Sequence, residues 1–270
     1  MEARTFPRLL TVPVRVTRNW IERIVEMEGV DRAVVLGAQA FTALFPLLIV
    51  YAALVAPGGE SGFVERLIAR LEIEGTSAET LRRAFTPPPP AEGGITAVGA
   101  VLVIVSALTF ARAMQRLYER AWKLEPLGMR ATGWGLLWLG GLTVVLTLRT
   151  IADMELTGTA DVAASLALGT VVWLATPFVL LARRVPFAAL LPSAVLTAAA
   201  MFVFSIVMVV VAPRTFGTSA EAYGLIGVAF AIVGWLISAS LVVMASTALG
   251  AVIAERAGFG RRGEAFDATA

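Results

Sequence analysis

GGITAVGAVLVIVSALTFARAMQRLYERAW, residues 93–122, is the stretch that decides the fold. It opens with an uncharged apolar run of about 20 residues, long enough to cross ~30 Å of hydrocarbon as a helix. Arginines begin where that run ends, which is typical of a spanning helix that emerges on the cytoplasmic side. Runs such as VLVIVSAL do not alternate apolar and polar residues, so they do not fit a barrel strand. The stretch therefore predicts a transmembrane helix.

Five further apolar stretches surround it, and the composition agrees with a membrane protein: 58% hydrophobic, 16% charged, and a mean hydropathy of +0.80. We predict an all-α, polytopic membrane protein with six transmembrane helices. The predicted spans are residues 33–56, 94–112, 132–150, 161–182, 187–212 and 223–253. Around the membrane domain (33–254) lie an N-terminal segment 1–32 and a polar tail 255–270, and an outer loop 57–93 joins the first two spans.

Most of the arginines lie in every second segment between the spans, which places them on one side of the membrane. An excess of basic residues on one side sets the orientation of a membrane protein. The N-terminal segment, the loop after the second span, the turn after the fourth span and the tail are the arginine-rich parts. Both termini are therefore predicted to face the cytoplasm of a bacterial inner membrane. The net charge of +2 hides a basic inner face that suits anionic lipids. We expect no nucleic-acid partner; a second copy or an envelope protein is an alternative partner.

NWIERIVEM, residues 19–27, predicts a short amphipathic helix before the first span. Trp20 and Ile24 fall on one helical face, and Arg23 and Glu26 on the other. This pattern is typical of a helix lying in the headgroup plane. We interpret it as a lead-in to the first span, without a binding partner.

The outer loop is also predicted to be partly helical. Residues 63–71 have helical apolar spacing, and residues 76–79 match a capping box. Four prolines, 87–90, then form a stiff spacer. We favour a packed extracytoplasmic lid over a ligand-binding vestibule.

The residues that usually carry catalysis are missing. The chain has no histidine and no cysteine, so imidazole and thiolate chemistry are excluded. No GxSxG, Walker A, GxGxxG or HExxH pattern occurs. Glu119 and Glu125 could contribute to a magnesium site, but a solvated surface turn is the better interpretation. We therefore predict a non-enzyme with no catalytic residues, no metal and no cofactor.

Arg112, Arg116 and Arg120 stand at i, i+4 and i+8, and so share one helical face. We call these three residues the basic ridge; Ser106 continues a polar surface nearby. Guanidinium groups bind phosphate and carboxylate through paired hydrogen bonds. The ridge is thus a candidate site for an anionic headgroup, and ordinary anchoring by snorkelling arginines is the alternative.

Prolines and polar residues in the spans suggest further positions. Gln39 and Thr42 lie one turn before Pro46, where they either line a polar path or bond to neighbouring helices. Pro46 and Pro177 lie three helices apart, as gating breaks in an inverted repeat would. A bend is expected near Gly234. Close helix packing is predicted at Ser246, Gly250 and Ala254.

Several stretches together resemble the YihY/BrkB family of bacterial inner-membrane proteins. They are residues 38–50, 93–122, 183–186, 222–236 and 248–255. The resemblance implies an inner-membrane protein; members carry labels such as virulence factor, and some are tied to envelope lipid export. An older ribonuclease label does not fit a chain without histidine. The family often has an acidic residue soon after the glycine of its last helix, and here the nearest one is Glu255.

Three functions are compatible with this sequence. A carrier or flippase-like exporter of an amphiphilic anion, such as an envelope lipid, would use the basic ridge and a polar cleft between the first, second and fourth spans. A non-transporting scaffold for envelope organisation would be packed without a cavity. A membrane nuclease would need clustered carboxylates. We favour the carrier, with the scaffold as the alternative.

Overall fold

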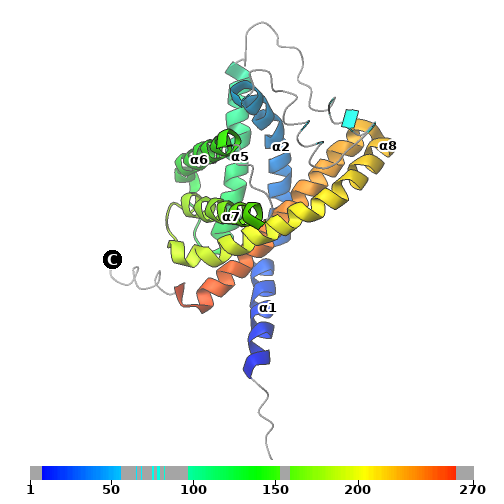
Figure 1. Cartoon of the computed structure of the whole chain (residues 1–270). Helices are drawn as coiled ribbons and strands as arrows, with labels where there is room; N and C mark the ends of the chain where they lie inside the picture. Colours follow the sequence, from blue (N-terminus) through cyan, green and yellow to red (C-terminus); the bar gives the residue numbers. More distant parts are fainter. Residues whose placement is uncertain are drawn as a thin grey trace, which may run out of the picture.

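A computed structural model of the chain describes residues 8–55, 97–152 and 159–259, together with Glu65, Ile68, Gly75, Ala78, Glu79 and Arg82. Within these residues the regular elements are all helical, which confirms the all-α prediction there. The helices are α1 (Arg8–Glu26), α2 (Gly29–Val55), α5 (Ala97–Ala121), α6 (Ala131–Ala152), α7 (Thr159–Leu180) and α8 (Phe187–Arg256), with a short 3₁₀ turn, η1 (Gly128–Arg130), before α6 (Figure 1).

Three of the described helices contain a stretch that is long and apolar enough to cross a membrane. These stretches are Val101–Ala121 in α5, Val162–Leu180 in α7 and Phe187–Arg256, which is all of α8. The apolar part of α6, Ala131–Val145, is shorter. Many large apolar side chains on these helices are exposed, such as Val203 and Phe230, as expected for surfaces that face lipid.

The 70-residue helix α8 is a hairpin of two helical arms. Gly224, with φ 59° and ψ −136°, is its one residue with non-helical dihedrals. Glycine reaches this region because it has no Cβ. Figure 1 shows the two arms side by side, folded back on each other. The bend expected near Gly234 is not found, since Gly234 lies within the second arm and has helical dihedrals; the break at Gly224 lies instead at the junction of the predicted spans 187–212 and 223–253.

Glycines let other helices approach the second arm closely. A Cβ on Gly37 of α2 would lie 2.7 Å from Cα of Ile237, and one on Gly29 would lie 2.8 Å from Sδ of Met244. At Gly37 the clash would be with backbone, so only glycine fits there, whereas at Gly29 the side chain of Met244 would have to move. Close backbone approach of this kind is how helices associate in membranes. The packing fixes α2 against α8.

The buried apolar residues form two clusters at opposite ends of the α8 hairpin. The larger cluster joins the α1–α2 turn, the end of α5 and both ends of α8, and includes Met27, Leu117, Leu190 and Met244. The smaller cluster joins Phe216 and Val228 of α8 to Ile68 and Ala78 of the loop 57–93. Part of that loop therefore packs on the turn of α8. Residues 76–77 and 87–90 lie outside the described residues.

Candidate functional site

The basic ridge forms an exposed stripe on an otherwise buried helix. Arg112, Arg116 and Arg120 are exposed, whereas every other residue between 111 and 121 is buried. Nη2 of Arg112 donates a hydrogen bond of 2.7 Å to Oγ1 of Thr132 on α6. Within the described residues, Arg116 and Arg120 form no ion pair. The ridge therefore presents guanidinium donors outward from the bundle.

The end of α5 turns its last side chains toward α1. Two backbone hydrogen bonds close the turn, from Leu124 N–H to the Glu119 carbonyl (2.8 Å) and from Lys123 N–H to the Arg120 carbonyl (3.2 Å). This pattern requires a left-handed residue after the helix, usually glycine. Here that residue is Lys123, with φ 52°. The lysine side chain therefore occupies a position after the helix that is usually filled by glycine, which has no side chain.

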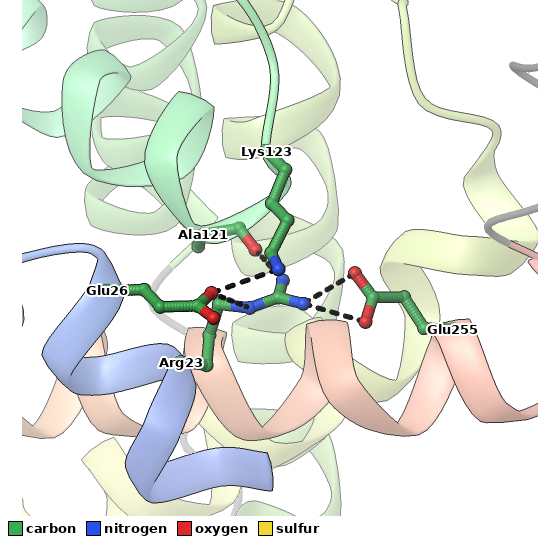
Figure 2. Close-up of polar contacts among 5 residues, drawn as sticks. All are labelled: Arg23, Glu26, Ala121, Lys123 and Glu255. Atoms are coloured by element: carbon green, nitrogen blue, oxygen red, sulfur yellow. Dashed lines mark hydrogen bonds and ion pairs between the residues drawn. The ribbon is translucent and has the colours of Figure 1, made fainter.

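Lys123 reaches back to α1, as Figure 2 shows. Its Nζ lies 2.9 Å from Oε2 of Glu26. The hydrogen bond from Lys123, and then the charges of Lys123 and Arg23, hold the pKa of Glu26 below its ordinary value. Both side chains are about half exposed, so the pair is a surface interaction of modest energy.

Arg23 is the centre of the contacts in Figure 2, and it joins three helices. Its side chain is only 6% exposed. Nη1 donates a hydrogen bond of 2.6 Å to the carbonyl of Ala121, the last residue of α5. Nη2 donates to both carboxylate oxygens of Glu255 on α8, at 2.7 and 2.8 Å. Arg23 thus satisfies a carbonyl that the helix end leaves without a partner.

Residues 19–27 are therefore more than a lead-in to the first span, because they pack on the bundle itself; the absence of a binding partner stays a prediction. The helix runs from Arg8 to Glu26, and it is anchored twice to the bundle, through Arg23 and through Trp20, whose Nε1 donates to the Ala245 carbonyl at 2.9 Å. Arg23 is buried because the ends of α8 and α5 cover this one residue of the polar face of α1, whereas Glu22 and Glu26 on the same face are exposed. Ile21, from the apolar face, is exposed instead.

A second polar cluster surrounds Glu119, which is 3% exposed. Its Oε1 accepts hydrogen bonds from Nε2 of Gln115 (2.9 Å), the N–H of Leu127 (3.0 Å) and Nη2 of Arg184 (3.1 Å). Arg184 also donates to the carbonyl of Glu125 at 2.7 Å. The predicted solvated turn is thus wrong for Glu119, because the α7–α8 turn covers it. The cluster ties α5 and the 122–127 loop to that turn.

The other candidate residues are spread over the bundle. Thr42 of α2 is exposed, and its Oγ1 donates to the Ala38 carbonyl of its own helix at 3.0 Å. Gln39 and Ser106 are half-buried on α2 and α5. Pro46 and Pro177 both lie inside continuous helices, α2 and α7.

The three small residues near the end of α8 are all buried: Ser246, Gly250 and Ala254. Gly250 lies against the backbone of Ser193, so a Cβ there would collide with the first arm. Ala254 belongs to the larger apolar cluster, which also contains Ala189 and Leu190 of the first arm.

Two of the surface cavities of the described residues have linings that do not include Gln39, Thr42 or Ser106. The first, which we call the α1–α5 groove, has a volume of about 450 Å³. Its charged lining consists of Glu26, Arg120, Lys123 and Glu125, with Met27 and Leu124 among its apolar residues. The second is an apolar cleft of about 140 Å³ between α6 and α7.

Sequence reasoning missed the partners in both polar clusters. Periodicity assigns residues to faces of one helix, whereas Arg23 and Glu255 meet only after the whole chain has folded. A buried arginine needs paired acceptors, but nothing near Arg23 in sequence identifies them. One available signal was the family's acidic position, since Glu255 is the carboxylate nearest to Gly250.

A family model described as Virulence factor BrkB matches residues 20–269. This match covers most of the chain, including α1 from Trp20 onward and all of the helices that follow. Comparison with curated proteins and with solved structures gave no match.

Proposed function

This chain belongs to the BrkB virulence-factor family, and from that membership we propose that it carries an amphiphilic anion, such as an envelope lipid, across the bacterial inner membrane. The basic ridge binds the anionic headgroup, and the apolar part of the molecule stays in the lipid. No catalytic step and no cofactor enter this proposal.

The proposed topology has six passes, with both termini in the cytoplasm. α2, α5, α6, α7 and the two arms of α8 supply the six helices. Each arm of α8 exceeds the ~20 residues that a pass requires. The orientation follows from the arginines near α1, the end of α5 and the α7–α8 turn, since basic residues favour the cytoplasmic side. Contacts among Arg23, Glu119 and Arg184 and their partners place these three parts at one end of the bundle.

The observation that carries the proposal is the exposed stripe of Arg112, Arg116 and Arg120 on a helix that is otherwise buried there. Charge at the edge of hydrocarbon is costly, so side chains placed there usually have a functional role. Arg112 and Arg116 lie within the candidate span Val101–Ala121. A phosphate or carboxylate sliding along the ridge would pass from one guanidinium to the next without losing its hydrogen bonds.

The second candidate function is a membrane scaffold, with a second copy or an envelope protein as its partner. It is favoured by one observation: the polar clusters around Arg23 and Glu119 tie the helices firmly together.

Lipid movement in liposomes distinguishes the two functions. The purified protein is reconstituted with fluorescent phosphatidylglycerol, and dithionite quenching measures how fast the label crosses the bilayer. We expect the wild type to accelerate crossing and Arg112→Gln/Arg116→Gln to slow it by about tenfold, the effect of losing charge-assisted hydrogen bonds. The matched control is Arg18→Gln/Arg130→Gln, which removes two other exposed arginines. Crossing no faster than in protein-free liposomes would favour the scaffold.

A further inference from the structure

The α1–α5 groove holds charges of both signs, and only some of them are paired. Lys123 and Glu26 neutralise each other at 2.9 Å. Arg120 and the carboxylate of Glu125 line the same groove, yet within the described residues neither forms an ion pair. One cation and one carboxylate are therefore left facing a shared space.

We propose that this groove binds the headgroup of a phospholipid that carries both a phosphate and a primary amine, as phosphoethanolamine does. Arg120 pairs with the phosphate, because guanidinium donors match phosphate oxygens. Glu125 pairs with the ammonium group, which has three N–H donors. A ligand with a negative charge alone would face the carboxylates of Glu26 and Glu125, and such juxtaposition disfavours binding.

The position of the groove favours a lipid over a soluble compound with the same headgroup. The candidate span of α5 ends at Ala121, next to Arg120, so the groove opens at the level of the bilayer surface. Leu124 lines it, and two exposed valines lie close in sequence to Met27, a lining residue that is itself buried: Val25 is 72% and Val30 is 55% exposed. Acyl chains can lie along these apolar side chains while the headgroup occupies the groove.

This site does not depend on transport. It uses Arg120 alone from the basic ridge, together with Glu125 from the loop that follows α5. A lipid bound there would bridge α1 and the end of α5, beside the contacts of Arg23, whether or not Arg112 and Arg116 carry a substrate.

Native mass spectrometry of the delipidated full-length protein tests the proposal. Phosphatidylethanolamine, phosphatidylcholine or phosphatidylglycerol is added back in mixed micelles, and retained lipid is counted. We expect the wild type to retain one phosphatidylethanolamine in preference to phosphatidylcholine, whose trimethylammonium group has no N–H to donate. Arg120→Gln/Glu125→Gln should weaken retention by about tenfold. Both residues are exposed, so this variant should fold, as its melting temperature will verify.

The matched control is Arg214→Gln/Glu221→Gln, which removes one exposed charge of each sign from α8 and should retain the lipid. Arg112→Gln/Arg116→Gln should also retain it, even where lipid transport is lost, which separates this site from the proposed function. Preference for phosphatidylglycerol, or equal retention by Arg120→Gln/Glu125→Gln, would overturn the proposal. Displacement of the lipid by equimolar soluble phosphoethanolamine would overturn the assignment to a lipid.

Discussion

Arg23 and Glu255 are 232 residues apart in the chain, yet Nη2 of Arg23 contacts both carboxylate oxygens of Glu255, at 2.7 and 2.8 Å. The arginine is 6% exposed and the glutamate 39%. The pair therefore joins the first described helix to the end of the last one. Because Arg23 also binds the Ala121 carbonyl, the same side chain holds the end of α5.

Removing the carboxylate should destabilise the protein more than removing both charges. Glu255→Gln removes the nearer of the two carboxylates that pair with the buried guanidinium and leaves only Glu26, whose Oε2 lies 3.8 Å from Nε of Arg23, so we expect a cost of about 2–4 kcal/mol in unfolding free energy. In Arg23→Met/Glu255→Gln the uncompensated charge is gone, so part of the stability should return. Thermal unfolding in detergent measures both. If the stability lost in the double variant equalled the sum of the losses in Glu255→Gln and in Arg23→Met alone, this expectation would be contradicted.

An exposed pair on the same helix provides the control. Arg18 and Glu22 lie at i, i+4, with Nε and Oε1 3.4 Å apart and side chains 72% and 58% exposed. Arg18→Met/Glu22→Gln should change stability by no more than about 0.5 kcal/mol, because water already screens both charges.

The sequence predicts the basic ridge but not the contacts of Arg23, for a physical reason. An α-helix repeats every 3.6 residues, so Arg112, Arg116 and Arg120 share a face, and this can be read from a short stretch of sequence. The burial of Arg23 depends instead on which helix end packs over α1. Amphipathic periodicity only separates the polar face of a helix from its apolar face. It therefore predicts that Arg23 faces the headgroups or water, and it gives no sign that another helix covers this residue.

Glu119 should govern the order of the loop that follows α5. Glu119→Ala removes the acceptor of the Leu127 N–H, of the buried amide of Gln115 and of the partly exposed guanidinium of Arg184, at a cost of about 1–3 kcal/mol. Hydrogen exchange at the Leu127 amide should therefore accelerate. Glu119→Gln keeps an oxygen acceptor and should accelerate exchange less. Equal exchange in the wild type and Glu119→Ala would refute the role of this carboxylate.

The predicted boundary between the last two spans differs from the turn that the structure shows. Composition placed a break between 212 and 223, where polar residues begin, but α8 stays helical to Gly224. Polar residues such as Glu221 do not end a helix; they only end the part that can lie in hydrocarbon. The turn occurs where glycine permits a positive φ.

Acid should weaken the contact between α1 and the turn after α5. The pKa of Glu26 is lowered in the folded protein, chiefly by the hydrogen bond from Lys123, so Glu26 stabilises the fold above the ordinary glutamate pKa of about 4.3. That contribution is lost as the pH falls through the lower folded-state pKa. In Lys123→Gln the Glu26 pKa should rise toward its ordinary value, which carboxyl-carbon NMR can measure. Lys123→Arg, which keeps the charge, is the control, and an unchanged pKa in Lys123→Gln would contradict this assignment.

Two glycines of the second α8 arm should respond oppositely to the same substitution. Gly250→Ala places a methyl group against the backbone of Ser193 and must push the arms apart, so we expect a loss of about 1–3 kcal/mol. Gly234 has no atom within 4 Å of its Cβ position, so Gly234→Ala should be neutral or stabilise the helix by about 0.5–1 kcal/mol. Melting temperatures of the two variants, measured side by side in detergent, give the comparison. Because both changes add one methyl group to the same helix, a similar shift in both would mean that the arms are not in close contact at Ser193.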